Sequence, residues 1–586
     1  MLRTNLEKLE RADLIRRTQF VLEIEYWFKH GLVQETTYEA LLKQDRRRLH
    51  HFVAEILEHW QDDSALTAVL ARHWDEAGES ARAFGYYVRT GDNAARVYAN
   101  KEALMAYQRA IELSEALELS HTQLAHLYVQ RGRVYELNAQ YDAALASYDA
   151  LEQVALARQD SALALEALLA RISIYATPNA RFDFERAIEL AQQAIVRARE
   201  LKDRAAEAKA LWLLLLVYSH SNRPRDAMPK GEAALALARE LNLRELTAYI
   251  LNDLGGVYIS EGDFASGLAL LQEANQLWRE LDNLPMLADN LSSRAGFLIY
   301  AGEMDAVLQL SDEAYHITER IGNLWGHSYS LFAVGVAHLE RGEFALAIAK
   351  MQECIAVGER AGFIAPRLDT QLDLGRAYLW LGETQRAIEV GEQTLKDIAG
   401  FPLGLPLCYA ALVEFYAAAG DLTRAQEHLH NARETLAQAN NLLVYEMYVE
   451  RAALLLAVAR GDWQTVRTMC AEVISQLEKI HVRLFLADVW YYLARALFEL
   501  GNANAGFDAL ARADAVAQAI GSRRMRWQIL ALRAEMEQAH GNHLLADESR
   551  EHARGLLRFI ADNAPVELRK VFLNRPDVRA LMEKDE

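Results

Sequence analysis

A glycine recurs in this chain at a regular interval, inside a short motif in which Asp, Glu or Asn follows it. Four successive copies, Gly262, Gly302, Gly342 and Gly382, are evenly spaced, and the series continues at nearly the same interval at Gly420, Gly461, Gly501 and Gly541. A fixed period of roughly 20 to 50 residues is the signature of repeat architectures, in which each unit packs only on its neighbours. Such an array explains how 586 residues can fold without one oversized core.

The repeated glycine predicts the end of a helix. Glycine adopts the left-handed backbone conformation without a side-chain clash, whereas inside a helix it would cost about 1 kcal/mol relative to alanine. The acidic or amide residue after it can cap the next helix. The residue after that, such as Phe264 or Met304, can pack back onto the first helix. Each glycine therefore predicts the turn of a helical hairpin.

Apolar residues on both sides of these turns have helical spacing. Around Gly262, the large residues Leu254 and Leu271 alternate with the small residues Gly255 and Gly267, which is typical of tetratricopeptide repeats. The period exceeds the standard length of about 34 residues, and the short linkers predict that the helices are longer. We predict an all-α tetratricopeptide-repeat solenoid, a right-handed superhelix of about twelve hairpins over residues 61–562. A C-terminal helical tail is expected at 563–586.

Composition limits the cellular compartments and the classes of partner that can be expected for this chain. The net charge of −19 argues against non-specific binding to nucleic acid, which needs a positive field. The 3 cysteines form no disulfide framework, and no apolar run approaches the ~20 residues of a membrane span. The first residues carry acids and do not form a secretory signal. We expect a cytoplasmic protein without a membrane partner, for which nucleic acid is an unlikely ligand.

The first sixty residues do not follow the repeat. Leu6 to Arg17 has the pattern of an amphipathic helix, and Phe20 to Phe28 alternates β-branched and aromatic residues in the manner of an extended segment. Two further helices are expected near 31–43 and 46–60. The basic run from Lys43 to His51 predicts either a solvated helix face or a docking site for nucleic acid or an acidic partner.

This region resembles a known family. The motif Tyr26-Trp-Phe-Lys-His30-Gly-Leu-Val-Gln-Glu35 and the run Arg46-Arg-Arg48-Leu-His50 resemble the end of the winged-helix domain in STAND-class signalling ATPases. Residues 70–104 and the tail from Leu568 to Leu581 are also similar to them. The resemblance implies a winged-helix remnant at 1–60 in front of the repeats. In the family, the histidine matching His30 can touch the nucleotide phosphate; here His30 is either an orphan contact of that kind or a locally packed helix-start residue.

The family's nucleotide-binding domain has no counterpart in the chain. No Gly-x-x-x-x-Gly-Lys-Ser/Thr loop and no Gly-Lys pair occurs, so no phosphate cradle is expected. Motifs for metallohydrolases, serine hydrolases, dithiol redox centres and calcium loops are also absent from the sequence. We therefore expect no enzyme activity, no catalytic residues, no metal and no cofactor. The chain resembles the C-terminal half of a STAND protein, cut or encoded separately.

The first helix of each hairpin is expected to line a concave groove, where non-core positions can contact a partner. Aromatic residues with interspersed Arg and Asp carry binding energy at protein interfaces, although several could serve packing inside the solenoid instead. The groove positions predicted in this way are Tyr249, Asn252, Asp289, Ser292, Tyr300, Tyr329, Phe332, Asp369, Arg376, Trp380, Tyr448, Arg451, Asp488, Tyr491 and Arg495.

These features favour a non-catalytic scaffold or sensor arm of a STAND-like signalling system, which binds a protein or peptide along the groove. Its partner would be a protein or peptide, or a separate effector or nucleotide-binding domain, and self-association stays open. The alternative is a small-ligand sensor that controls a separate ATPase or transcriptional activator. A third hypothesis is a nucleic-acid-binding regulator that uses residues 1–60.

Overall fold

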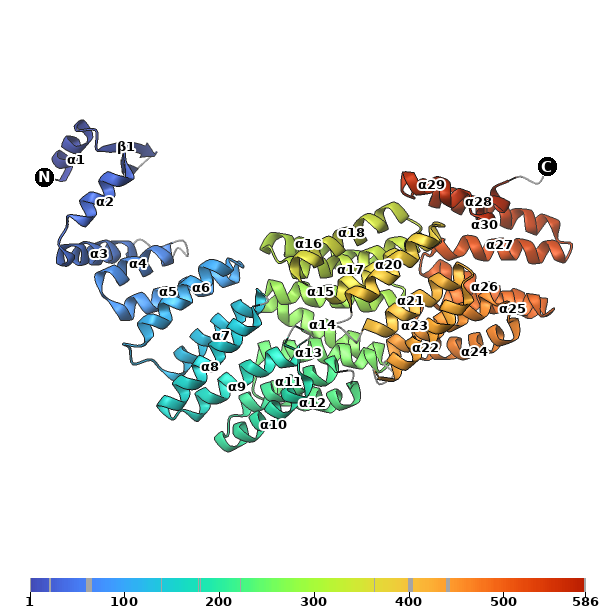
Figure 1. Cartoon of the computed structure of the whole chain (residues 1–586), viewed down its shortest axis with the longest axis horizontal. Coiled ribbons are helices and arrows are strands. Elements are labelled where there is room, and N and C mark those ends of the chain that lie inside the picture. The colour runs from blue at the N-terminus through green and yellow to red at the C-terminus, as the bar shows by residue number, and fades with distance from the viewer. Residues whose placement is uncertain are drawn as a thin grey trace. The chain divides into compact units, whose positions relative to one another are not determined.

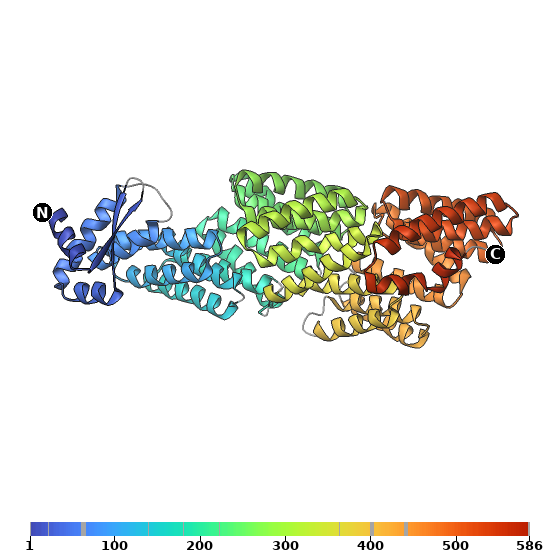
Figure 2. The same cartoon turned by 90° about the horizontal axis from the view of Figure 1, so that it is seen from above.

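The computed structural model confirms the all-α class (Figures 1 and 2). It describes residues 2–20, 23–59, 66–138, 140–177, 179, 181–221, 223–362, 364–398, 404–438 and 443–583. Within these residues the chain forms thirty helices and two strands. The contacts within the chain divide it into two compact units, an N-terminal unit of residues 1–167 and a C-terminal unit of residues 168–586.

The N-terminal unit begins with a small hairpin and continues as a series of helices. Strand β1 pairs with β2 in antiparallel register, with Ile15 opposite Phe28. The elements are α1 (Leu2–Arg11), β1 (Ile15–Phe20), β2 (Glu23–Phe28), α2 (Gly31–Glu39), α3 (Lys43–Glu58), α4 (Thr67–Ala77), α5 (Ser80–Arg96), α6 (Asn100–Ser114), α7 (His121–Leu137) and α8 (Tyr141–Arg158). Helix α9 (Ser161–Ala176) crosses the boundary between the units.

The predicted helix from Leu6 to Arg17 is wrong in its second half. Helix α1 ends at Arg11, and Asp13 adopts a positive φ of 60°, which turns the chain into β1. The extended segment before Phe28 is confirmed as β2, but its partner strand was not predicted. The two helices expected next are confirmed as α2 and α3. The predicted domain limit at residue 60 falls in 60–65, outside the described residues, and the three predicted domains stay a prediction.

The C-terminal unit is a continuous series of hairpins. Its helices are α10 (Phe184–Leu201), α11 (Arg204–His220), α12 (Pro224–Glu240), α13 (Arg244–Ser260), α14 (Phe264–Glu280), α15 (Leu284–Ala301), α16 (Met304–Ile321), α17 (Leu324–Glu340), α18 (Phe344–Ala361), α19 (Ile364–Trp380), α20 (Thr384–Asp397), α21 (Leu405–Ala418), α22 (Leu422–Gln438), α23 (Leu443–Ala459), α24 (Trp463–Lys479), α25 (Leu486–Glu499), α26 (Ala503–Ala519), α27 (Arg523–Ala539), α28 (His543–Asp562), α29 (Val566–Leu573) and α30 (Pro576–Met582). Most of them span between four and five turns, which confirms the prediction of long repeat helices.

The eight repeated glycines all lie at hairpin turns and have positive φ, for example +91° at Gly262 and +78° at Gly302. The capping prediction holds for the aspartates. Asp263 accepts a hydrogen bond from the backbone N–H of Ser266 at 3.1 Å. It does not hold for the glutamates. Glu343 makes no cap and instead lies 2.6 Å from the Nδ1 atom of His338.

Small residues allow the two helices of a hairpin to approach closely. A Cβ atom on Gly267 would lie 2.5 Å from the carbonyl oxygen of Gly255. The same arrangement occurs in the N-terminal unit, where a Cβ atom on Gly132 would lie 2.2 Å from the ring of Tyr148. Large side chains fill the remaining space, and Phe264 is only 5% exposed. These contacts are the core that the repeat pattern predicted.

The C-terminal unit also closes on itself along a line of contacts that we call the seam. The turns at Gly262, Gly302 and Gly342 lie against Ile480, Ile520 and Ile560 respectively, always with the same separation along the sequence. Backbone hydrogen bonds cross the seam from Arg483 N–H to the carbonyl of Tyr300 at 2.7 Å and from Ala345 N–H to that of Asn563 at 2.7 Å. In Figure 1, the red helices α27 to α30 accordingly lie alongside the yellow-green α17 to α20.

No helix in the described residues is long and apolar enough to cross a membrane.

Candidate functional site

The first helices of successive hairpins carry a row of half-buried aromatic and polar side chains. Along α13, Leu251 and Leu254 point to the hairpin core and are 0% and 1% exposed, whereas Tyr249 and Asp253 are half-buried. We call this row the inner face. Its members are Trp212, Tyr249, Asn252, Asp253, Asp289, Ser293, Tyr300, Tyr329, Phe332, Asp369, Tyr445 and Tyr448.

Aromatic rings form one end of the inner face. The indole N–H of Trp212 donates to a carboxylate oxygen of Asp253 at 2.7 Å. The Trp212 ring lies 5.3 Å from the ring of Tyr249, which in turn packs edge-on against Trp278 at 4.8 Å. Trp278 comes from the second helix α14 and is fully buried. The core therefore fixes the position of Tyr249, which a rigid binding surface requires.

Asparagine side chains link the next two hairpins. Asn252 donates to Asp289 at 3.4 Å and accepts a hydrogen bond from Asn290 at 3.0 Å. Asn290 is completely buried and accepts from Asn275 at 3.0 Å. This ladder runs from α14 through α15 to α13, and it holds the Asn252 amide in one orientation.

Tyr329 occupies the middle of the inner face. Its hydroxyl lies 3.1 Å from that of Ser293, and its ring contacts Trp325 at 5.6 Å and is stacked on Phe332 at 6.3 Å. These contacts join α15 to α17. Ser293 was not predicted, because the repeat pattern had suggested its neighbour Ser292 instead.

Helix α23, much later in the chain, contributes to the same surface. The hydroxyls of Tyr300 on α15 and Tyr448 on α23 share a hydrogen bond. The backbone carbonyl of Tyr300 is bound by Arg483 across the seam. Because the seam brings α23 back to α15, residues far apart in the sequence face one another here. Side chains of α15 and α23 therefore meet at Tyr300.

Three carboxylates of the inner face, Asp253, Asp289 and Asp369, form no ion pair with a described residue. Burial raises the pKa of Asp253 to about 7, with Asp289 adding to the effect and Trp212 opposing it. Burial raises the pKa of Asp289 to about 6. Burial and the charge of Asp373 raise the pKa of Asp369 to about 7, although Arg376 opposes the rise. Desolvation disfavours a carboxylate that no cation compensates.

Asp369→Asn should stabilise the chain above neutral pH and leave it unchanged in acid. Between the unfolded and folded pKa values, the folded state holds a proton that the unfolded state has lost, so the free energy of unfolding falls as pH rises. The amide removes this penalty, which we expect to be roughly 1–2 kcal/mol for a half-buried group. Thermal melts at about pH 4 and about pH 8 would check it. Equal shifts of the melting temperature at both pH values would contradict the raised pKa of Asp369.

The other acids of this region are paired. Glu414 on α21 accepts from Arg376 at 3.1 Å and from Arg451 at 2.9 Å, and all three are 6% exposed. Burial alone would raise the pKa of Glu414, but the charges of Arg451 and Arg376 outweigh it and lower the pKa to about 2. Arg376 also donates to Asp373 at 2.8 Å.

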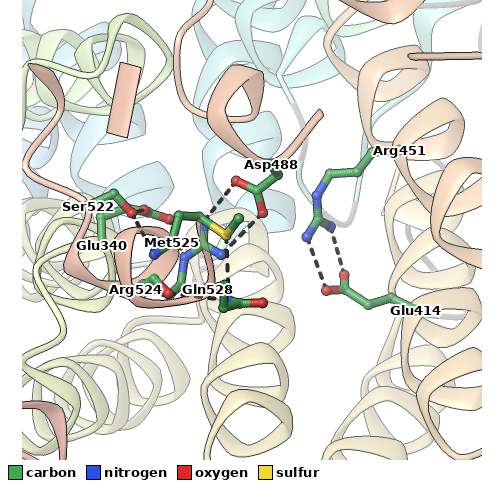
Figure 3. A network of polar contacts seen from close by, with 8 residues as sticks. All are labelled: Glu340, Glu414, Arg451, Asp488, Ser522, Arg524, Met525 and Gln528. Carbon is green, nitrogen blue, oxygen red and sulfur yellow. Dashed lines mark hydrogen bonds and ion pairs between the residues drawn. The ribbon is translucent and has the colours of Figure 1, made fainter. Parts of the chain in front are cut away.

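A second buried network crosses the seam (Figure 3). Arg524 on α27 donates to Glu340 on α17 at 2.9 Å and to Asp488 on α25 at 3.0 Å. The Ser522 hydroxyl donates to the other oxygen of Glu340. Glu340, Asp488 and Arg524 are between 3% and 5% exposed. Figure 3 shows the Arg524 guanidinium between the two carboxylates, and the separate Arg451–Glu414 pair beside it.

The remaining predicted residues lie in several environments. Ser292 is 1% exposed and donates to Ala288 in its own helix. The Trp380 ring lies under the Arg524 guanidinium at 4.3 Å. Tyr491 packs on Tyr492, and Arg495 pairs with Glu499 at 2.9 Å and with Glu535.

His30 belongs to the N-terminal unit, whereas the inner face is built from the C-terminal unit. It is exposed, it immediately precedes α2, and its side chain makes no cap. The helix start is confirmed, but the exposed side chain shows no local packing, and the choice between the two roles of His30 stays a prediction.

Several residues of these networks were not predicted: Asp253, Ser293, Glu340, Glu414, Tyr445 and Arg524. Glu414 had a usable signal, since it is the one charge in the apolar helix LPLCYAALVEFYAA. An acid inside such a helix predicts a buried partner. Arg524 had no such signal, because its partners lie 36 and 184 residues away.

The hairpins and the inner face define a tetratricopeptide-like helical repeat protein. No protein-family model matches the chain. No curated protein matches it.

Distantly similar structures have been solved. Aspartyl phosphate phosphatase F from Bacillus subtilis is 13% identical, with 61% of this chain and 95% of that chain covered and a TM-score of 0.39. The APC/C hetero-tetramer Cut9–Hcn1 contains a chain that is 17% identical, with 94% of this chain and 98% of that chain covered and a TM-score of 0.41. A Rap protein complexed with competence and sporulation factor is 12% identical, with 75% of this chain and 98% of that chain covered and a TM-score of 0.28.

Proposed function

We propose that this protein is a non-catalytic binding protein that holds an extended peptide, or an extended segment of a partner protein, along its inner face. The observation that carries the proposal is the distribution of the inner-face side chains. They follow one another over the first helices α11, α13, α15, α17 and α19, and side chains of α23 join the row at Tyr300. A small ligand would be held by groups that converge in a single pocket.

The length of the row supports a peptide of moderate size. Packed helices are about 8–10 Å apart, so the five first helices from Trp212 to Asp369 cover roughly 30–40 Å. A chain in extended conformation covers that distance with about ten residues. Tyrosine and tryptophan lose little conformational entropy on binding and offer both a ring and a polar group.

A direct test is selection of random dodecapeptides on the immobilised full chain, followed by affinity measurement with fluorescently labelled winners. The Tyr249→Ala/Tyr329→Ala variant should bind them at least about 30-fold more weakly, because each central aromatic residue is worth on the order of 2 kcal/mol. The matched control is Tyr315→Ala, on the second helix α16 and away from the inner face. Equal loss in the control, or none in the double variant, would refute the proposal.

We further propose that the chain acts as the sensor or scaffold arm of a STAND-like signalling system. Exposed apolar side chains of the N-terminal unit support attachment to another domain. Trp27, Leu32, Leu42 and Phe52 are 63%, 74%, 73% and 60% exposed. Exposed apolar surface marks interaction sites where several large side chains contribute to it. Co-elution with a separately produced STAND nucleotide-binding domain would test this assignment.

A further inference from the structure

The buried acids of the C-terminal unit fall into two groups, those that form an ion pair and those that do not. Glu414 shares two arginines, and Glu340 and Asp488 share Arg524, so the fold supplies a cation wherever the acid is buried most deeply. Asp253, Asp289 and Asp369 form no ion pair with a described residue, although the charge of Arg376 acts on Asp369. Asp369 in particular has no hydrogen bond to any described residue, and Asp289 has one weak contact from Asn252 at 3.4 Å.

The charge of Asp369 acts on four tyrosines. Burial is the main cause of the raised pKa of Tyr300, Tyr329, Tyr445 and Tyr448, and the charge of nearby Asp369 adds to it in each case. Asp289 adds to the rise for Tyr329 as well. Asp289, Tyr329 and Asp369 occupy equivalent positions on the successive first helices α15, α17 and α19, so Tyr329 lies between the two carboxylates in the row. Aromatic faces and carboxylates both attract cations, and the attraction is strongest where water is scarce.

Charge complementarity indicates which ligand group fits the carboxylates of the inner face. Leaving three carboxylates without a cation costs stability, and a ligand that brings a positive charge removes that cost on binding. Building on the proposed function, we infer that the bound peptide carries an arginine or lysine side chain, which lies between Asp289 and Asp369 against the ring of Tyr329. Asp253, held by Trp212, extends the same negative surface by one hairpin.

Three peptide sublibraries test this inference on the full chain. All are N-acetylated, C-amidated decapeptides with randomised flanks, and they differ only in a fixed central residue, which is arginine, citrulline or glutamate. Acetylation removes the terminal amine as an alternative cation. The arginine sublibrary should be retained at least about tenfold more than the citrulline sublibrary, and glutamate should be retained least.

The Asp289→Asn/Asp369→Asn variant should lose this preference while it still folds, because each amide has the shape of the acid it replaces. The control Asp312→Asn/Asp562→Asn removes two charges from side chains that are 73% and 75% exposed, and it should keep the preference. Retention that depends on Tyr249 and Tyr329 but ignores the central residue would overturn the inference and leave the proposed function standing. Absence of retention in all three sublibraries would overturn both.

Discussion

Replacing Arg524 with methionine should lower the free energy of unfolding of residues 168–586 by about 3–5 kcal/mol. The guanidinium bridges Glu340 and Asp488, and all three side chains are nearly inaccessible to water. Methionine fills similar space but leaves two buried carboxylates without a cation. Urea denaturation followed by far-ultraviolet circular dichroism would measure the change. Amide hydrogen exchange should localise the loss of protection to α17, α25 and α27.

Arg526→Met is the matched control for this prediction. Arg526 lies on the same helix and donates to Asp514 at 3.0 Å, but its side chain is 32% exposed. Solvent screens such a pair, so its loss should cost no more than about 1 kcal/mol. Replacing Arg524, Glu340 and Asp488 together by methionine or leucine should restore most of the stability, since no buried charge then remains. Equal costs for Arg524→Met and Arg526→Met would contradict the buried network.

Gly302→Ala should destabilise the C-terminal unit by about 2–4 kcal/mol, in two separable parts. The first part is backbone strain, because Gly302 has a φ of +78°. The second part is a clash across the seam, where the new Cβ atom would lie 2.4 Å from the Cγ2 atom of Ile520. Thermal and urea denaturation of the single variant would measure the total.

Gly420→Ala separates the two parts. Gly420 has a φ of +79°, but a Cβ atom there would meet nothing within 4 Å. Its substitution should show the strain alone, about 1–2 kcal/mol. The Gly302→Ala/Ile520→Ala double variant should be more stable than additivity predicts, because the smaller side chain relieves the clash. If Gly302→Ala cost no more than Gly420→Ala, the seam would be open in solution.

Local features of the repeat were predictable from the sequence. A glycine at a hairpin turn and a small residue opposite a large one act over a few residues, so Gly262, Gly267 and Phe264 could be placed without any long-range information. The end of α1 could not, because the turn at Asp13 depends on the pairing of β1 with β2. Such pairing overrides the helical pattern that extends to Arg17.

The inner face was partly predictable for the same reason. Tyr249, Asp289, Tyr329 and Asp369 occupy equivalent positions in successive first helices, and all four are half-buried in the structure, while their role in binding stays a prediction. Which charged residues pair with one another depends on the seam and could not be derived from the repeat. Asp488 was predicted as a groove residue, yet it is 3% exposed and bound to Arg524.

The three isoleucines that receive the turn glycines, Ile480, Ile520 and Ile560, are themselves one repeat apart. The three isoleucines have the same side chain, so a shift of the seam by one whole repeat would place isoleucine against a turn glycine again. Under that shift Glu340 would meet Ala564 in place of Arg524, and a buried carboxylate would face no cation. The triad of Glu340, Asp488 and Arg524 therefore specifies the register of the seam, as a single buried polar residue specifies the register of a coiled coil.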